Sequence, residues 1–177
     1  MLRLAGAILA SVVAAAPGCS TPERESGGAR ERAARVARVA DGDTVVVSVG
    51  GSQRTVRLIG VDSPESVRPG TPVECGAPRA SESLEGLLRE GTRLRLVADP
   101  SQDRLDRYGR LLRYVELERS GTDVGAVQVR RGWADVYVYG PSGAARRTDA
   151  YERARERAEA RGAGVFGACD GDFHSAR

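Results

Sequence analysis

Three short runs of β-branched and aliphatic residues, 36–40, 44–49 and 54–61, constrain the fold more than any other feature of this chain. An Asp-Gly-Asp sequence separates the first two runs, and a Gly-Gly pair lies between the second and the third. Runs this short favour strands over helices, and Asp-Gly and Gly-Gly pairs are typical of tight hairpin turns. The sequence therefore predicts three consecutive antiparallel strands.

The residues that follow alternate between helical and extended patterns. Residues 72–90 have a helical period, and Thr71 and Glu74 have the spacing of a capping box. The apolar residues on one face of this helix are Ala77, Ala80, Leu84, Leu87 and Leu88. We then expect strands at 93–98 and 111–118, a helix at 123–131, an extended segment at 133–139, and a helix at 147–161 with Ala150, Ala154 and Ala158 on one side.

These elements predict an α+β fold, a five-stranded OB-type β-barrel with about three packed helices. Periodicity alone does not separate this barrel from other α+β folds. With 177 residues, of which 41% are apolar and 29% charged, the chain fits one globular domain. No internal stretch reaches the roughly 18 apolar residues that a membrane span requires.

The N-terminus has the pattern of an export signal. Arg3 precedes a short apolar run over 4–16, so residues 1–18 are expected to be a signal peptide. The "PGCS" sequence at 17–20 resembles a bacterial lipoprotein signal, in which Cys19 would carry the lipid anchor. Ordinary cleavage that frees or removes Cys19 is the alternative. We therefore expect an exported protein, either a cell-envelope lipoprotein or extracellular.

The composition after the signal divides the rest of the chain. Residues 19–34 are rich in Ser, Gly, Pro and charge without apolar periodicity, which is typical of a flexible tether. The folded domain is expected at 35–169, followed by a C-terminal tail at 170–177. If Cys19 is lipidated, Cys75 and Cys169 are left as a pair, and we expect them to form a disulfide in an exported chain; two free thiols are the alternative.

Charge and histidine content limit the chemistry. The net charge is +3, but all 27 basic residues are Arg, a bias that a GC-rich genome produces, so the total charge is weak evidence for nucleic-acid binding. His174 is the single histidine and lies three residues from the C-terminus. Acid–base catalysis would therefore depend mainly on carboxylates, Tyr or metal-bound water.

Five separated motifs resemble the staphylococcal nuclease (thermonuclease) family in order and spacing. They are "DGDT" at 41–44, "RLIGVDSPE" at 57–65, "ECGAPRASE" at 74–82, "DRYGRLL" at 106–112 and "VYVYGP" at 136–141. The resemblance covers about residues 35–167 and implies a five-stranded OB barrel with three helices, the element order expected above.

The resemblance implies a cation site near the ends of two neighbouring strands. Asp43 precedes one strand and Asp62 follows another, and two carboxylates brought close together repel unless a cation or proton lies between them. Carboxylates, water and phosphate form an all-oxygen ligand set that suits Ca²⁺ or Mg²⁺. In the resembling family the matching residues bind Ca²⁺, with a main-chain oxygen at the position of Ser63.

The same resemblance implies three catalytic residues. Glu65 would accept a proton from the attacking water or orient that water, two roles that the sequence does not separate. Arg57 and Arg110 carry planar guanidinium groups that match pairs of phosphate oxygens. The resemblance also places Tyr108 and Tyr137 at the nucleotide and Tyr139 at its edge, where aromatic faces stack on any base. Tyr139 packed against the barrel is the alternative.

Together these expectations describe a metal-dependent phosphodiesterase, an endonuclease using Ca²⁺ or Mg²⁺. It would be a monomer that hydrolyses single- and double-stranded DNA and RNA with little sequence preference and leaves 3′-phosphate ends. The alternative is a non-catalytic OB module that binds nucleic acid or a protein ligand. Such a module would not require Arg57, Glu65 and Arg110 together with two metal-binding aspartates.

Overall fold

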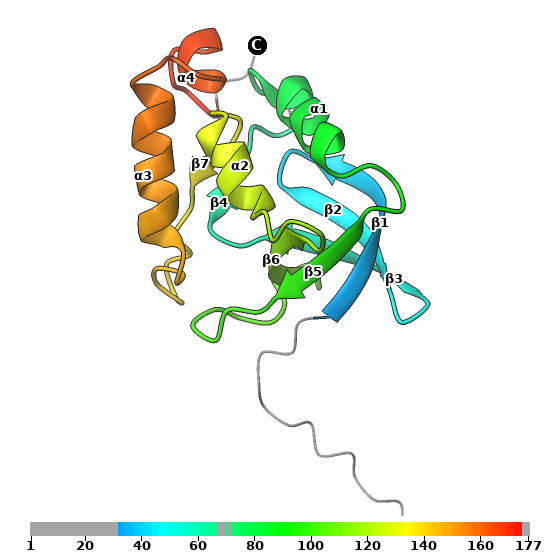
Figure 1. Cartoon of the computed structure of the whole chain (residues 1–177). Coiled ribbons are helices and arrows are strands. Elements are labelled where there is room, and N and C mark those ends of the chain that lie inside the picture. The colour runs from blue at the N-terminus through cyan, green and yellow to red at the C-terminus, as the bar shows by residue number, and fades with distance from the viewer. Residues whose placement is uncertain (1–31, 67–69, 71, 175–177) are drawn as a thin grey trace, which may run out of the picture.

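The computed structural model describes residues 32–66, 70 and 72–174 (Figure 1). The strands are β1 (Arg32–Asp41), β2 (Thr44–Val49), β3 (Ser52–Leu58), β4 (Val61–Asp62), β5 (Arg93–Val97), β6 (Leu111–Leu117) and β7 (Asp135–Val136). The helices are α1 (Ala77–Leu87), α2 (Val124–Arg130), α3 (Thr148–Glu159) and α4 (Val165–Ala168). Five strands close a barrel in the order β1-β2-β3-β6-β5, which confirms the predicted α+β barrel.

The first three strands form the predicted antiparallel meander. Gly50 and Gly51 turn the chain between β2 and β3 with positive φ angles of 57° and 82°, which glycine adopts without steric cost. β1 starts earlier than the run at 36–40 because its first residues pair with β5. β3 pairs with β6 in parallel, and this pairing closes the barrel.

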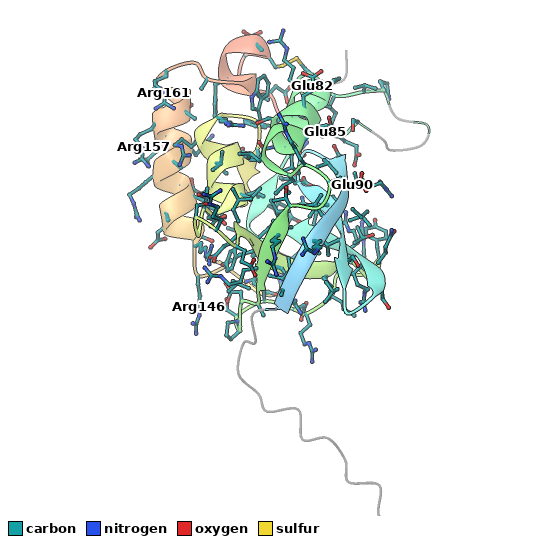
Figure 2. All side chains as sticks on the ribbon, turned by 45° about the vertical axis from the view of Figure 1, so that its right-hand side comes forward. Glu82, Glu85, Glu90, Arg146, Arg157 and Arg161 are labelled. Carbon is teal, nitrogen blue, oxygen red and sulfur yellow. A yellow bond between two sulfur atoms is a disulfide. The ribbon has the colours of Figure 1, made fainter. Side chains whose placement is uncertain are left out.

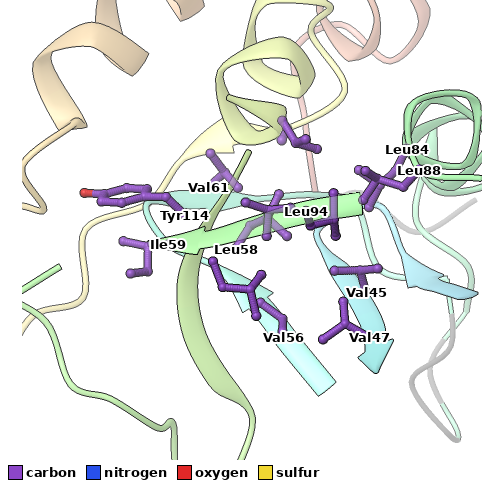
Figure 3. Packing of buried hydrophobic residues seen from close by; sticks show 14 of the residues in the cluster. Val45, Val47, Val56, Leu58, Ile59, Val61, Leu84, Leu88, Leu94 and Tyr114 are labelled. Atoms are coloured by element: carbon purple, nitrogen blue, oxygen red, sulfur yellow. The ribbon is translucent and has the colours of Figure 1, made fainter. Parts of the chain in front are cut away.

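The core fills the barrel and the space under the helices. Figure 3 shows side chains from β2, β3, β5 and α1 converging on one another. The labelled residues of this cluster are Val45, Val47, Val56, Leu58, Ile59, Val61, Leu84, Leu88, Leu94 and Tyr114. Each fully buried Val or Leu stabilises the folded state by about 1.5–3 kcal/mol relative to an exposed one. Residues 44–47 of β2 are all buried, whereas along β3 the buried Val56 and Leu58 alternate with the half-buried Thr55 and Arg57.

Two details of the helices differ from expectation. The capping box at α1 is wrong, because Gly76 is the N-cap and makes no side-chain cap, while the Glu74 carboxylate accepts from the Glu65 N–H instead. In α3 the buried face carries Tyr151, Ala154 and Ala158, whereas Ala150 is exposed. The large ring of Tyr151 directs that helix toward the core, and Ala150 consequently points to solvent.

The C-terminal part packs as a second, smaller cluster. Cys75 and Cys169 form a disulfide with their Cα atoms 6.0 Å apart, which ties the start of α1 to the end of α4. Val165 and Phe173 are buried beside it. The disulfide therefore holds residues 169–174 against the same side of the molecule as the residues that precede α1.

Surface charge is distributed over different elements. Figure 2 shows Glu82 and Glu85 on α1 and Arg157 on α3, with Arg161 just beyond the end of α3. Among the described residues no helix is long and apolar enough to cross a membrane.

Candidate active site

One cleft with two adjoining lobes lies beside β3, β4 and the loop that precedes β6. The aromatic lobe has a volume of about 300 Å³, and its lining includes Leu105, Tyr108, Tyr137 and Tyr139. The acidic lobe has a volume of about 380 Å³, and its lining includes Asp41, Asp43, Asp62, Glu65 and Glu74. Both lobes are lined by Arg57, Asp62, Arg107, Tyr108 and Arg110. The arginines therefore lie where the two lobes meet.

Strand pairing brings these residues together from distant parts of the sequence. Thr44 is paired with Arg57 between β2 and β3, which sets Asp43 beside the Arg57 side chain. Arg57 is also paired with Leu112 of β6, so Arg110 lies near the same end of the barrel. β4 pairs with β7, and the Tyr137 N–H donates to the Gly60 carbonyl over 3.0 Å. The cleft is thus a direct product of the barrel topology.

Arg57 links the two aspartates that the sequence singled out. Its Nε lies 3.1 Å from Asp43 Oδ1, and its Nη2 lies 2.5 Å from Asp62 Oδ1. Nη1 of Arg57 donates to the main-chain oxygens of Leu58 and Val61. The guanidinium therefore fixes the relative position of the two carboxylates, a structural role that the sequence did not reveal.

Asp43 is buried and fully engaged by the protein. Its Oδ1 accepts the Thr44 hydroxyl over 2.8 Å, and its Oδ2 accepts both the N–H and the hydroxyl of Ser63, over 2.8 and 3.0 Å. Together with the contact to Arg57, these four interactions use both oxygens. Asp43 therefore ties the β1–β2 turn to the residues after β4.

The other acids of this lobe are crowded. The pKa of Asp41 is raised to about 6, chiefly by burial and also by its hydrogen bond with the Glu65 carboxyl. Burial also raises the pKa of Asp62; the charge of Arg57 opposes the rise and that of Asp43 adds to it. The charged forms of these carboxylates are thus incompletely compensated by the described protein groups.

A tight loop holds Arg110 and Tyr108. Asp106 accepts the N–H groups of Tyr108 and Arg110, each over 2.9 Å, and its Oδ2 lies 2.5 Å from Arg110 Nε. Burial alone would raise the pKa of Asp106, but the hydrogen bonds from Arg110 and Tyr108 lower it. Tyr108 is 68% exposed, with the Arg110 guanidinium 5.3 Å from its ring centre. The loop therefore presents an aromatic face and a cation side by side.

The folded part of the chain is similar to proteins of one known family. Residues 55–166 match the family described as staphylococcal nuclease homologue. The chain belongs to the staphylococcal nuclease family. It is 42% identical over 89 residues to a thermonuclease of Staphylococcus hyicus, covering 50% of this chain and 51% of that protein.

Two further relatives are similar to this chain over longer stretches. A thermonuclease of Staphylococcus intermedius is 38% identical over 109 residues, which are 60% of this chain and 61% of that protein. The endonuclease YncB of Bacillus subtilis is 40% identical over 106 residues, which are 59% of this chain and 48% of that protein. The chain thus spans between 48% and 61% of the length of these relatives.

The structure brings all the candidate catalytic, metal-binding and substrate-binding residues to one cleft. The lining of the cleft includes Arg57, Glu65, Arg110, Asp43, Asp62, Ser63, Tyr108, Tyr137 and Tyr139. Their chemical roles stay predictions. Cys19 lies outside the described residues.

Sequence reasoning missed three residues of the acidic lobe: Asp41, Glu74 and His174. Asp41 stands inside the "DGDT" motif, but an Asp-Gly pair by itself indicates only a turn. Glu74 accepts the Glu65 N–H over 2.6 Å, and its own N–H donates to the Glu65 carbonyl over 3.0 Å. This reciprocal pair fixes the main chain at Glu65, so Glu74 is a positioning residue.

The residues of the acidic lobe fit a divalent cation. The carboxylates of this lobe are crowded, and the pKa values of Asp41 and Asp62 are raised. A bound cation would stabilise the charged forms of these carboxylates. Among the described residues, no three His, Cys, Asp or Glu side chains converge to hold an ion by themselves. A cation here would accordingly take further ligands from water, main-chain oxygen or phosphate.

Proposed function

We propose that the chain is a cation-dependent phosphodiesterase that cleaves DNA and RNA, single- and double-stranded, and leaves 3′-phosphate ends. One observation carries the proposal: Arg57 and Arg110 lie between an aromatic lobe and an acidic lobe of the same cleft. A nucleotide stacked in the first lobe would set its phosphate against the arginines, with the acids on the other side. That order of groups matches the needs of phosphodiester hydrolysis.

The protein residues divide the reaction between them. Glu65 accepts a proton from a water molecule or orients it, while that water forms a bond to phosphorus. The bond from phosphorus to the 5′ oxygen breaks, the 5′ oxygen leaves as a hydroxyl after gaining a proton, and the phosphate stays on the 3′ oxygen. Arg110 and Arg57 stabilise the negative charge that grows on the other phosphate oxygens. Glu74 keeps Glu65 in place.

The cation is proposed to be Ca²⁺, with Mg²⁺ as the second choice, because the acidic lobe offers oxygen donors. Asp62 and Asp43, with the main-chain oxygen of Ser63, are the residues proposed to hold it. When bound, it would supply positive charge at the phosphate and relieve the repulsion among the acids.

Low sequence preference follows from the aromatic lobe. Tyr108, Tyr137 and Tyr139 are each at least 45% exposed, so their faces are accessible to a base. Stacking on an aromatic face contributes about 1–3 kcal/mol per base and depends little on which base is present. Substrate choice would then rest on the backbone, which DNA and RNA share.

The test is a cleavage assay with the purified chain on single-stranded DNA, double-stranded DNA and RNA, each in Ca²⁺, Mg²⁺ or EDTA. We expect cleavage with a divalent cation and none in EDTA. The product strands should accept a 5′ label from a kinase without prior phosphatase treatment, because their 5′ ends carry hydroxyls. Internal cleavage of a circular substrate distinguishes an endonuclease from an exonuclease.

A matched pair of variants guards against a contaminating nuclease. Arg110→Ala should abolish most of the activity, whereas Arg157→Ala, on the exposed face of α3 in Figure 2, should leave it unchanged. Binding of nucleic acid without cleavage in any cation would favour the non-catalytic OB module instead.

The location of the protein is a separate proposal that rests on the sequence. We propose that residues 1–18 direct export, that Cys19 carries a lipid anchor, and that the segment between Cys19 and β1 tethers a monomeric domain. Residues 32–34 of the expected tether belong to β1, and Phe173 of the expected tail at 170–177 is buried, so the folded domain extends beyond 35–169 at both ends. Membrane fractionation of the wild type and of Cys19→Ser tests the anchor. A wild type that fractionates as a soluble, unacylated protein would refute it.

A further inference from the structure

Residues 169–174 return to the acidic lobe, where the side chain of His174 lies. The disulfide between Cys75 and Cys169 fixes the start of this segment. Phe173 is buried, with its ring centre 5.2 Å from that of Phe166. Two anchors therefore hold the segment, and the side chain of His174 lines the acidic lobe.

The His174 imidazole lies between two carboxylates, one on each ring nitrogen. Nδ1 is 3.4 Å from Glu74 Oε2, and Nε2 is 3.6 Å from Asp62 Oδ2. A histidine that binds a metal usually donates its second ring N–H to a carboxylate, which fixes the ring and its tautomer. Glu74 has that place here, and Nε2 faces the carboxylate proposed above to hold the cation.

Asp62 is oriented to share a cation with this ring. Its Oδ1 accepts a hydrogen bond from Arg57 Nη2, whereas its Oδ2 is the oxygen nearest to His174. Asp43 uses both of its oxygens for Thr44, Arg57 and Ser63. Asp62 Oδ2 is accordingly the aspartate oxygen better placed to bind an ion in this arrangement.

We infer that His174 Nε2 and Asp62 Oδ2 are neighbouring ligands of one divalent cation, with Glu74 orienting the imidazole. This inference rests on the cation site of the proposed function and adds a nitrogen ligand to it. Two ligands about 2.1 Å from a metal lie about 3.0–3.4 Å apart in octahedral or tetrahedral geometry. The observed 3.6 Å is close to that spacing, so a small rotation of either side chain completes it.

A nitrogen ligand changes which cations the site prefers. Imidazole suits first-row transition metals, whereas Ca²⁺ takes oxygen ligands. The site should then bind Mn²⁺ and Co²⁺ with an advantage that depends on His174. The disulfide contributes to this preference because it holds the segment that carries the histidine.

Mn²⁺ added to the full chain tests the inference directly. Electron spin echo envelope modulation of bound Mn²⁺ should show coupling to an imidazole nitrogen in the wild type and none in His174→Ala. Isothermal titration should show that His174→Ala weakens Mn²⁺ binding about 10-fold or more, while Ca²⁺ binding changes much less. Asp170→Asn, an exposed change in the same segment, is the matched control and should bind both ions as the wild type does.

The possible outcomes separate this inference from the proposed function. Mn²⁺ bound without nitrogen coupling, or equally well by His174→Ala, would overturn the histidine ligand while cleavage in Ca²⁺ still supported the nuclease. Absence of both cation binding and cleavage would overturn both. Reduction of the disulfide in protein that stays folded by circular dichroism should weaken Mn²⁺ binding toward the level of His174→Ala, and unchanged binding would count against the role of the segment.

Discussion

Two clusters of acidic residues in this protein have opposite electrostatic character. The acids of the cleft include Asp41 and Asp62, whose pKa values are raised chiefly by burial. The second group, here called the Arg147 cluster, comprises Arg147, Arg95, Asp99, Glu116, Asp123, Tyr114 and Tyr151. There burial also acts to raise the pKa values of Asp99 and Glu116, but hydrogen bonds and ion pairs lower them.

The number of donors explains the difference. Arg147 lies 2.5 Å from Glu116 and 2.6 Å from Asp123, and Arg95 contacts Glu116 through two nitrogens. The Tyr151 hydroxyl donates to Asp123 as well. In the cleft, by contrast, one arginine serves two aspartates, and Asp41 and Glu65 face each other. The acids of the Arg147 cluster have enough donors and stabilise the fold, whereas the crowded acids of the cleft remain available to bind a cation.

The largest expected effect is on the Arg147 cluster. Arg147→Met should lower the free energy of unfolding by about 3 kcal/mol, the low end for breaking a buried ion pair, because Glu116 loses one of its two arginines and Asp123 loses the guanidinium that contacts its Oδ2. Urea denaturation measures this, and turnover of the remaining folded protein should be normal. Arg157→Met on the exposed side of α3 should change stability by less than about 0.5 kcal/mol. Equal effects of the two changes would show that the cluster is not a structural network.

Glu65→Gln should lower turnover and leave stability intact, the reverse of what we expect for Arg147→Met. We expect kcat to fall about 100-fold or more, since glutamine cannot accept the proton of water, which corresponds to about 3 kcal/mol of barrier. Stability should be unchanged or slightly higher, because one crowded negative charge is removed. Glu82→Gln on α1 (Figure 2) is the control and should retain full turnover. A folded Glu65→Gln variant with near wild-type kcat would exclude the role assigned to Glu65.

The pH dependence of stability sharpens the comparison further. The pKa of Asp41 is raised from 3.8 to about 6, so the native state holds this proton more tightly than the unfolded state. The contribution of Asp41 to stability is therefore complete below about pH 3.8 and is lost as the pH rises through about 6. Without added cation, Asp41→Asn should accordingly be about 1–2 kcal/mol more stable than the wild type at pH 8 and similar to it near pH 4.

The asparagine substitution keeps an acceptor oxygen for the Gly42 N–H and the Ser66 hydroxyl, which Asp41 Oδ1 contacts over 2.7 and 3.0 Å. The change thus isolates the charge. Saturating Ca²⁺ should reduce the advantage of the variant, since the cation stabilises the charged acids of the wild type. An advantage that is the same at pH 4 and pH 8 would mean that the crowding of Asp41 is not electrostatic.

The sequence was informative where local patterns determine structure. Glycine turns and β-branched runs predicted β2 and β3, and the same strands explain why Asp43 and Arg57 lie together. Helical periodicity predicts α1, but the spacing of Glu74 from Thr71 wrongly indicates a helix cap. Its true partner is Glu65, nine residues earlier.

Long-range contacts were beyond local patterns. The approach of His174 to Asp62 depends on a chain path set by the disulfide and by Phe173, which no short motif encodes. The Arg147 cluster likewise joins residues 24 and 31 positions apart. In an arginine-rich chain nothing in the sequence distinguishes Arg147 from the exposed arginines of α3. Only the folded structure shows that Arg147 forms the ion pairs that stabilise it.

The smallest expected effect is on substrate binding in the aromatic lobe, whereas the changes in the two acid clusters should alter stability or turnover. Tyr137→Ala should raise KM about tenfold and change kcat little, because stacking stabilises the bound substrate and the transition state about equally. Val138→Ala is a suitable control: Val138 is as exposed as Tyr137, at 45%, but adjacent residues of an extended segment point to opposite sides. Both variants should unfold at nearly the wild-type urea concentration, because neither side chain is buried. If Tyr137→Ala lowered kcat as strongly as Glu65→Gln while KM stayed constant, the aromatic lobe would act on the reacting phosphate rather than on the base. The division of the cleft into a binding lobe and a reacting lobe would then be wrong.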